Sequence, residues 1–236
     1  MGPFFTYALQ SAICLAAFYL FYKVLLSRET FHRFNRIALL SVLALSLIIP
    51  LTLSYHFSGL FQTVSTNAPH LANIEIEGLF VENALLPDKD TESGNRYIAW
   101  LLLIYLAGCT ICLIQTVFSI AHIFRIISKG KCINREHKII TIISDNKKIS
   151  PFSWMNYIVL SQSDYDEAGT SIIAHEKAHI SQRHTYDLII SRICIILQWF
   201  NPTAWLLYQE IQNIHEYEAD ERVIRQGIDA RQYQLC

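Results

Sequence analysis

The chain has 236 residues, of which 52% are hydrophobic and only 17% charged, and its mean hydropathy is +0.27. Soluble domains usually carry about a quarter charged residues, so this chain is unusually poor in charge. The net charge of −1 gives no basic field for nucleic acid, and the six cysteines lie in apolar runs or are scattered, which argues against a disulfide framework.

Three long apolar segments fill the first half of the chain, and we predict a membrane region over residues 1–126. About 20 apolar residues suffice for a helix to cross the hydrocarbon core, and residues 4–22, 37–57 and 98–124 each reach that length. A membrane helix tolerates the kink that Pro50 would introduce into the second segment. The basic residue of the first segment follows it, and no small-residue cleavage site appears, so we expect an anchor instead of a signal peptide.

The segments between the apolar stretches differ in charge and therefore predict an orientation. Residues 23–36 and 125–135 are rich in Lys and Arg, whereas residues 58–96 hold six acidic and two basic side chains. The positive-inside rule then places both basic segments in the cytoplasm and residues 58–96 outside as an extracytoplasmic loop. We accordingly expect the N-terminus outside and residues 127–236 as a cytoplasmic domain.

The predicted cytoplasmic domain begins with strands and continues with helices. Residues 138–144 and 149–160 are rich in β-branched and aromatic side chains, and Pro151 confines the second stretch to a sheet edge or a strand start. A helix is predicted over residues 166–181.

Residues 186–200 are strongly apolar, but their uncharged part is too short to span a bilayer, which favours a buried or membrane-resting helix. A break at Asn201-Pro202 precedes a last helix over residues 203–225, for which Gly227 is a plausible stop. No closing feature follows, so we expect this sequence to be part of a longer chain.

The sequence H-E-x-x-H at His175, Glu176 and His179 is the strongest chemical signal. Positions i and i+4 of a helix share a face, so both imidazoles can point at one metal ion, and Glu176 is then beside a water on that metal. Zinc accepts nitrogen ligands and tolerates an open fourth position for hydrolysis. The pattern arises by chance about one time in fifty in such a composition, and the alternative is two surface histidines on an amphipathic helix.

A catalytic zinc site usually needs a third protein ligand, and the last predicted helix offers candidates. Glu216 and Asp220 are four residues apart, so one carboxylate can bind the metal while the other orients a ligand. His215 is a rival, although it points about 100° away from Glu216 and only one of them can face the site. Glu218 and Glu221 are expected on a solvated acidic face.

Four short motifs resemble the M56 peptidase family of membrane metalloproteases, the β-lactam sensor–transducer type, which is related to the M48 proteases. They are SPFSW, HEKAH, WFNPTAW and EYEAD, at residues 150–154, 175–179, 199–205 and 216–220. The resemblance covers the whole chain. It implies an α-helical membrane protein with three transmembrane helices, followed by a mainly α zincin-type domain with a small β-sheet.

The resemblance also implies zinc as the cofactor and a role for each matching residue. It assigns zinc ligation to His175, His179 and Glu216, the catalytic base to Glu176, and support of a ligand to Asp220. The chain departs from the family pattern at His184, where many relatives have Asp. Whether Asp187 takes over that supporting role is open, and His184 is otherwise a polar residue of a helix turn.

These observations predict an integral-membrane zinc endopeptidase of a bacterial plasma membrane, with its catalytic domain in the cytoplasm. The expected partners are membrane lipid and a protein substrate, either a cytoplasmic regulator or the chain itself, in a signalling pathway. The alternative is a zinc-binding receptor or scaffold that cleaves nothing, and the intact Glu176 argues against it. A transporter with a fortuitous motif is disfavoured because the apolar segments hold almost no ionisable residues.

Overall fold

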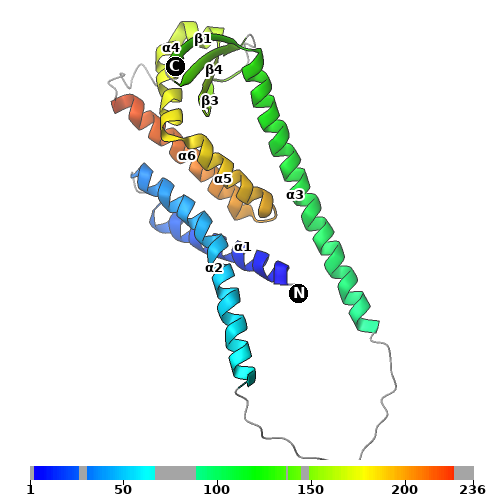
Figure 1. Ribbon diagram of the computed structural model, residues 1–236. Coiled ribbons are helices and arrows are strands. Elements are labelled where there is room, and N and C mark those ends of the chain that lie inside the picture. The colour runs from blue at the N-terminus through cyan, green and yellow to red at the C-terminus, as the bar shows by residue number, and fades with distance from the viewer. Residues whose placement is uncertain (1–2, 27–30, 67–88, 137, 145–148, 226–236) are drawn as a thin grey trace, which may run out of the picture.

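The computed structural model describes residues 3–26, 31–66, 89–136, 138–144 and 149–225. Within these ranges the protein is mostly helical, with one small mixed sheet at the upper end of the molecule (Figure 1). Gly227 lies outside the described residues, as does most of the predicted extracytoplasmic loop, residues 67–88.

Three helices, α1 (Pro3–Leu25), α2 (His32–Thr66) and α3 (Lys89–Lys129), contain the three apolar segments predicted from the sequence. By length and composition, the parts of these helices suited to crossing a membrane are Phe4–Leu25, His32–Thr52 and Arg96–Lys129. Helix α2 continues through Pro50 to Thr66, so the described ends of residues 58–96 are helical. The side of the membrane on which each end lies stays a prediction.

The sheet contains β1 (Lys131–Glu136), β2 (Ile139–Ser144), β3 (Phe152–Trp154) and β4 (Tyr157–Ser161) in the order β1-β2-β4-β3. Strands β2 and β4 are parallel and the other pairs are antiparallel. The stretch predicted as one strand over residues 149–160 is therefore a hairpin, because the chain turns at Met155 with a φ of 51°. Its first half, β3, is an edge strand, as Pro151 indicated.

Strand β1 was not predicted, because its sequence alternates weakly and is largely polar. It follows α3 directly through Gly130, where an added Cβ would collide with the side chain of Ile142 on β2. The close approach of α3 to the sheet therefore requires glycine at this position.

Helix α4 (Gln162–Gln182) carries the H-E-x-x-H sequence and begins four residues earlier than predicted. Ser161 caps it with a capping box, in which the Ser161 side chain accepts from the backbone N–H of Asp164. The helix ends at Arg183 in the left-handed conformation, φ 60°, and α5 (His184–Leu197) begins at once. This sharp turn brings the start of α5 next to the end of α4.

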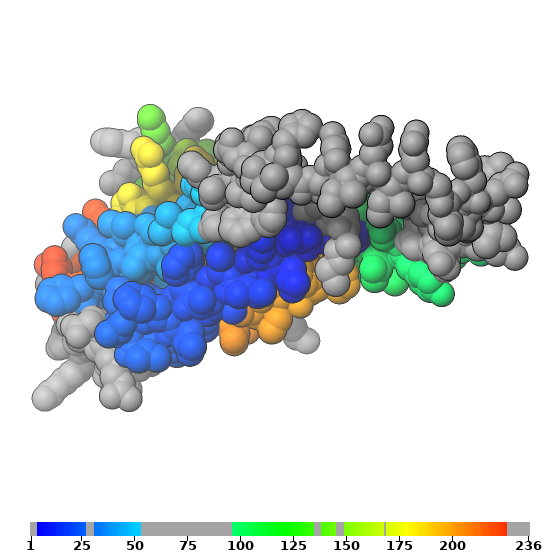
Figure 2. Space-filling view, turned by 90° about the horizontal axis from the view of Figure 1, so that it is seen from below, coloured from blue at the N-terminus to red at the C-terminus, as the bar shows by residue number. Residues whose placement is uncertain are grey.

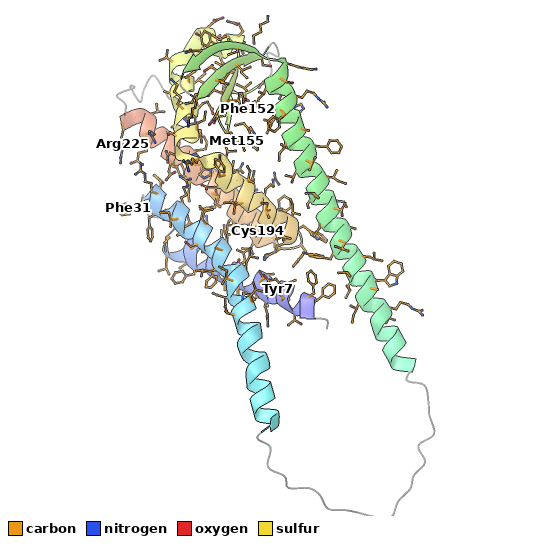
Figure 3. The ribbon with its side chains drawn as sticks, viewed as in Figure 1. Tyr7, Phe31, Phe152, Met155, Cys194 and Arg225 are labelled. Carbon is orange, nitrogen blue, oxygen red and sulfur yellow. The ribbon has the colours of Figure 1, made fainter. Side chains whose placement is uncertain are left out.

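Helices α5 and α6 (Pro202–Arg225) form a hairpin that packs against α1 and α2. Figures 1 and 2 show α1 lying against this hairpin. Cys194, labelled on α5 in Figure 3, is buried where these helices meet. The four helices share one buried apolar core, formed by Leu15, Tyr22, Leu39, Leu43, Cys194, Ile195, Ala204, Leu207, Ile211 and Ile214. The first and last parts of the chain are thus held together by the same hydrophobic contacts.

The tip of this hairpin lies beside the apolar helices α1 and α3. Gln198 donates to Ser11 Oγ over 2.7 Å. The Tyr105 hydroxyl donates to the carbonyl of Leu197 over 2.9 Å, and the Trp199 indole donates to the carbonyl of Tyr105 over 3.2 Å. Helix α5 therefore packs against the apolar helices, as its composition predicted.

Candidate metal centre

The two histidines of the H-E-x-x-H sequence meet on one face of α4. The Nε2 atoms of His175 and His179 are 3.0 Å apart, and each side chain is 14% exposed. Two imidazole nitrogens turned toward each other at this distance are arranged to share one metal ion.

Helix α6 brings Glu216 to the same point. Its Oε2 lies 3.4 Å from His175 Nε2 and its Oε1 lies 3.7 Å from His179 Nε2. Tetrahedral zinc bonds of about 2.0–2.1 Å would place the ligand atoms about 3.3 Å apart, so this donor set fits zinc. Among the described residues, His175, His179 and Glu216 form the group whose donor atoms converge, all within 4.8 Å of one another.

These donors line a cavity of about 360 Å³ between the edge strand β3 and helices α4, α5 and α6. Glu216 is 61% exposed at its side chain, so the donor group is open to solvent on the α6 side. The lining residues are Pro151, Phe152, Ser153, His175, Glu176, His179, His184, Thr185, Leu188, Gln212, His215 and Glu216.

Glu176 points into this cavity and is 7% exposed. Burial raises the pKa of its carboxyl above the usual 4.5, although the Ser153 side chain and the charge of His175 oppose the shift. A raised pKa brings a carboxylate closer to the range in which it serves as a general base near neutral pH.

The two histidines differ in their pKa shifts. Burial lowers the pKa of His179 to about 4, so its ring is neutral near pH 7, as a metal ligand must be. Burial acts on His175 in the same direction. Its hydrogen bond with Glu216 and the nearby carboxylates outweigh that effect, so the pKa of His175 is raised.

Asp220 lies one turn after Glu216, where its Oδ1 is 3.2 Å from His175 Nδ1. It thus contacts the ring nitrogen of His175 that faces away from the donor group. A carboxylate in this position can orient an imidazole whose other nitrogen binds a metal.

Asp187 is linked to the donor group only through other side chains. Its Oδ2 accepts from His215 Nε2 at 3.0 Å and from Arg36 Nε at 2.6 Å. The His215 ring stacks on the His184 ring, with centroids 3.9 Å apart. Asp187 is therefore connected to the donor group through His215 and His184, and His215 turns toward Asp187 instead of joining the donor atoms.

Glu218 is buried, although the sequence predicted that it lies on a solvated acidic face. It is 3% exposed, and its Oε2 accepts from His184 Nε2 at 3.0 Å and from Arg36 Nη1 at 3.3 Å. The prediction is wrong for Glu218 because α2 covers this side of α6 and supplies the arginine. No local sequence pattern identifies that partner.

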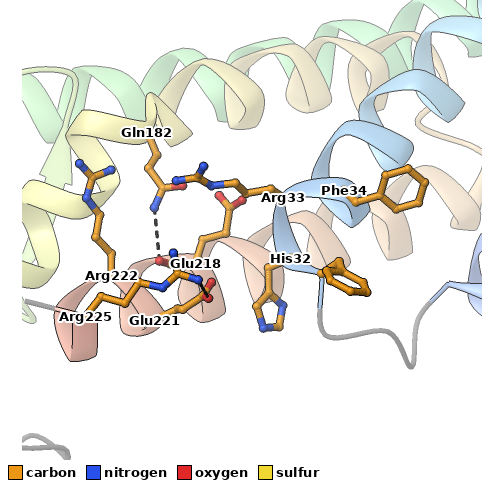
Figure 4. A pocket seen from close by; sticks show the side chains of 9 residues that line it. His32, Arg33, Phe34, Gln182, Glu218, Glu221, Arg222 and Arg225 are labelled. Atoms are coloured by element: carbon orange, nitrogen blue, oxygen red, sulfur yellow. Dashed lines mark hydrogen bonds and ion pairs between the residues drawn. The ribbon is translucent and has the colours of Figure 1, made fainter.

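A second cavity, of about 700 Å³, lies beside Glu218 where α2 begins and α6 ends (Figure 4). Its lining is rich in charge and consists of Phe31, His32, Arg33, Phe34, Gln182, Glu218, Glu221, Arg222 and Arg225. None of these residues lines the metal cavity.

The H-E-x-x-H sequence of α4 is met by a glutamate from α6, and α5 and α6 pack against three apolar helices that are long enough to cross a membrane. This combination is that of a membrane protein of the metallopeptidase class. The chain belongs to the M56 peptidase family: the family model described as BlaR1 peptidase M56 matches residues 4–233. This confirms the resemblance seen in the sequence motifs.

The chain is also similar to "Regulatory protein BlaR1" of Staphylococcus aureus, with 36% identity over 78 residues. That match covers 31% of this chain and 13% of the relative. The chain thus spans only a small part of the relative's length.

Proposed function

We propose that this chain is a zinc-dependent endopeptidase of the bacterial plasma membrane that cuts a protein substrate on the cytoplasmic side, as a step in signal transduction. The observation that supports the proposal best is the convergence of His175, His179 and Glu216 next to the buried carboxyl of Glu176. The M56 family and the three apolar helices agree with it.

His175, His179 and Glu216 would hold the zinc ion. The chemistry that zinc supplies in such a site is Lewis-acid polarisation of a peptide carbonyl. Glu176 would accept a proton at its carboxylate from the attacking water and return it to the nitrogen of the leaving amine. Its burial and raised pKa suit both transfers.

The edge strand β3 supports a role in holding the substrate. Phe152 and Ser153 line the metal cavity, and β3 pairs with β4 on one side only among the described residues. An extended peptide could pair with the outer edge of β3 and so pass the donor group.

The alternative is a receptor or scaffold that binds zinc and cleaves nothing. The relative's description as a regulatory protein is compatible with either function. The two are separated by comparing cells that express the wild-type chain with cells that express Glu176→Gln, using mass spectrometry of protein N-termini.

We expect new N-termini, from a cytoplasmic regulator or from the chain itself, only with the wild type, and their loss when zinc is chelated. Identical N-termini in both strains, with zinc bound in both proteins, would favour the receptor.

A further inference from the structure

Arg36 lies in the basic start of helix α2, four residues after the first residue of the helix. A charge that is largely buried is costly unless it is paired. The Arg36 side chain is only 19% exposed, and its guanidinium faces the helices that carry the metal cavity.

The guanidinium contacts each of the three helices that form the site. Its Nη2 donates to the carbonyl of Gln182, at the end of α4, over 2.8 Å. Its Nε lies 2.6 Å from Asp187 on α5, and its Nη1 lies 3.3 Å from Glu218 on α6. The donors of arginine lie in a rigid planar fork, whereas those of lysine are on a compact ammonium at the end of a flexible stem.

The contact with Glu218 leads directly to a predicted metal ligand. Glu218 Oε2 accepts the Nε2–H of His184 over 3.0 Å, which leaves His184 Nδ1 as an acceptor. That atom lies 2.7 Å from His179 Nδ1. His179 then donates from Nδ1 and presents the lone pair of Nε2 to the donor group, the tautomer that a metal needs.

We propose that Arg36 is a positioning residue of the metal site, acting through Glu218 and His184 to fix the imidazole of His179. The inference rests on the proposed zinc site. The inference also gives His184 a role. Its ring, hydrogen-bonded to Glu218, would support His179 in place of the aspartate that the family pattern has at this position.

Arg36 matters because Glu218 is otherwise poorly held. The carboxylate is buried, and its Oε1 has no hydrogen-bond partner among the described residues. Without the guanidinium, His184 would be the one remaining side-chain donor to the carboxylate in the described part of the chain. A buried carboxylate with so little support would turn or draw in water, and the orientation of His184 would loosen with it.

The test is zinc affinity, measured by competition with a chelator on the detergent-solubilised full chain. Outer hydrogen-bond partners of metal ligands typically contribute about 10–100-fold in affinity, so Arg36→Gln should weaken zinc binding by about tenfold or more. Arg36→Lys should recover only part of the loss. The absorption bands of the Co²⁺-substituted protein should change in Arg36→Gln, since they report ligand geometry.

Lys23→Gln is the matched control, because Lys23 also joins an apolar helix to α6, through an ion pair with Glu210 at 3.1 Å. It should leave zinc affinity unchanged. Should Arg36→Gln fail to fold, Glu218→Ala tests the same link, because it removes the acceptor shared by Arg36 and His184, and it should also lower zinc affinity. In a double-mutant cycle, the two losses should be less than additive.

Zinc affinity of Arg36→Gln within twofold of the wild type would overturn the inference, and so would an equal loss in Lys23→Gln. A wild-type chain that binds no zinc would overturn the metal site itself and the inference with it. Because binding is measured without a substrate, failure to cleave any protein would leave this inference intact.

Discussion

Gln198 at the end of α5 donates a hydrogen bond to the hydroxyl of Ser11 on α1 over 2.7 Å, between residues 187 positions apart. Both side chains are buried. The bond fixes the tip of the α5–α6 hairpin against a helix that the sequence assigns to the membrane. The helices that carry His184 and Glu216 are therefore anchored to the membrane region by polar as well as apolar contacts.

The contact between α3 and this tip provides a test of the packing. An added Cβ at Gly108 would collide with the indole of Trp199. Overpacking of this kind typically costs about 1–3 kcal/mol, so Gly108→Val should lower the thermal unfolding midpoint in detergent. Ala107→Val, at the neighbouring exposed position, should have little effect. Equal midpoints for the two variants would contradict the α3–α5 contact.

Glu176→Gln should retain zinc in equimolar amount, because the three ligands remain. It should abolish peptide cleavage, because an amide cannot accept the proton of the attacking water. Elemental analysis and a cleavage assay on the same preparation would check both halves. Normal cleavage by this variant would refute the assigned base.

Glu216→Ala should sharply lower zinc affinity, because it removes one of the three converging donors. Asp220→Ala should lower it less, since Asp220 contacts only the outer nitrogen of His175. Glu221→Ala is the control on the same helix, where Glu221 pairs with Arg225 at the surface. Zinc measured after dialysis should rank the three variants in this order, and full zinc in Glu216→Ala would show that another residue is the third ligand.

Acid should weaken the contacts of Asp187. Burial alone would raise the pKa of its carboxyl, but the hydrogen bonds from His215 and Arg36 outweigh burial and hold it below 3.8. A depressed carboxyl pKa contributes stability above the unfolded-state value, and that stability is lost as the pH falls through the folded-state value.

Asp187→Asn should therefore be less stable than the wild type near neutral pH. The gap between their unfolding midpoints should close only as the pH falls below 3.8. A gap that is constant across this range would mean that the charge of Asp187 does not contribute.

The orientation in the membrane is tested by reporter fusions. A reporter after residue 75 should be active outside the cell and one after residue 145 in the cytoplasm, because the flanking segments differ in Lys and Arg content. The opposite pattern would overturn a cytoplasmic protease.

The sequence by itself determined the features that depend on residues close together along the chain. The apolar segments are recognisable because membrane crossing depends on length and composition. The pair His175 and His179 is recognisable because helical periodicity places i and i+4 on one face. The capping box of Ser161 and Asp164 was also present in the sequence, although the predicted helix start at residue 166 overlooked it.

Only the tertiary structure decided which side chains of α6 reach the two histidines of α4 and which are held away from them. Spacing on that helix left His215 and Glu216 as rivals and placed Glu218 in solvent, whereas packing turns His215 toward Asp187 and buries Glu218 against Arg36. Arg36 and Glu218 are 182 residues apart. Which face of α6 is covered depends on how α2 packs against it, and that contact is set by the shared core of four helices, which no local pattern contains.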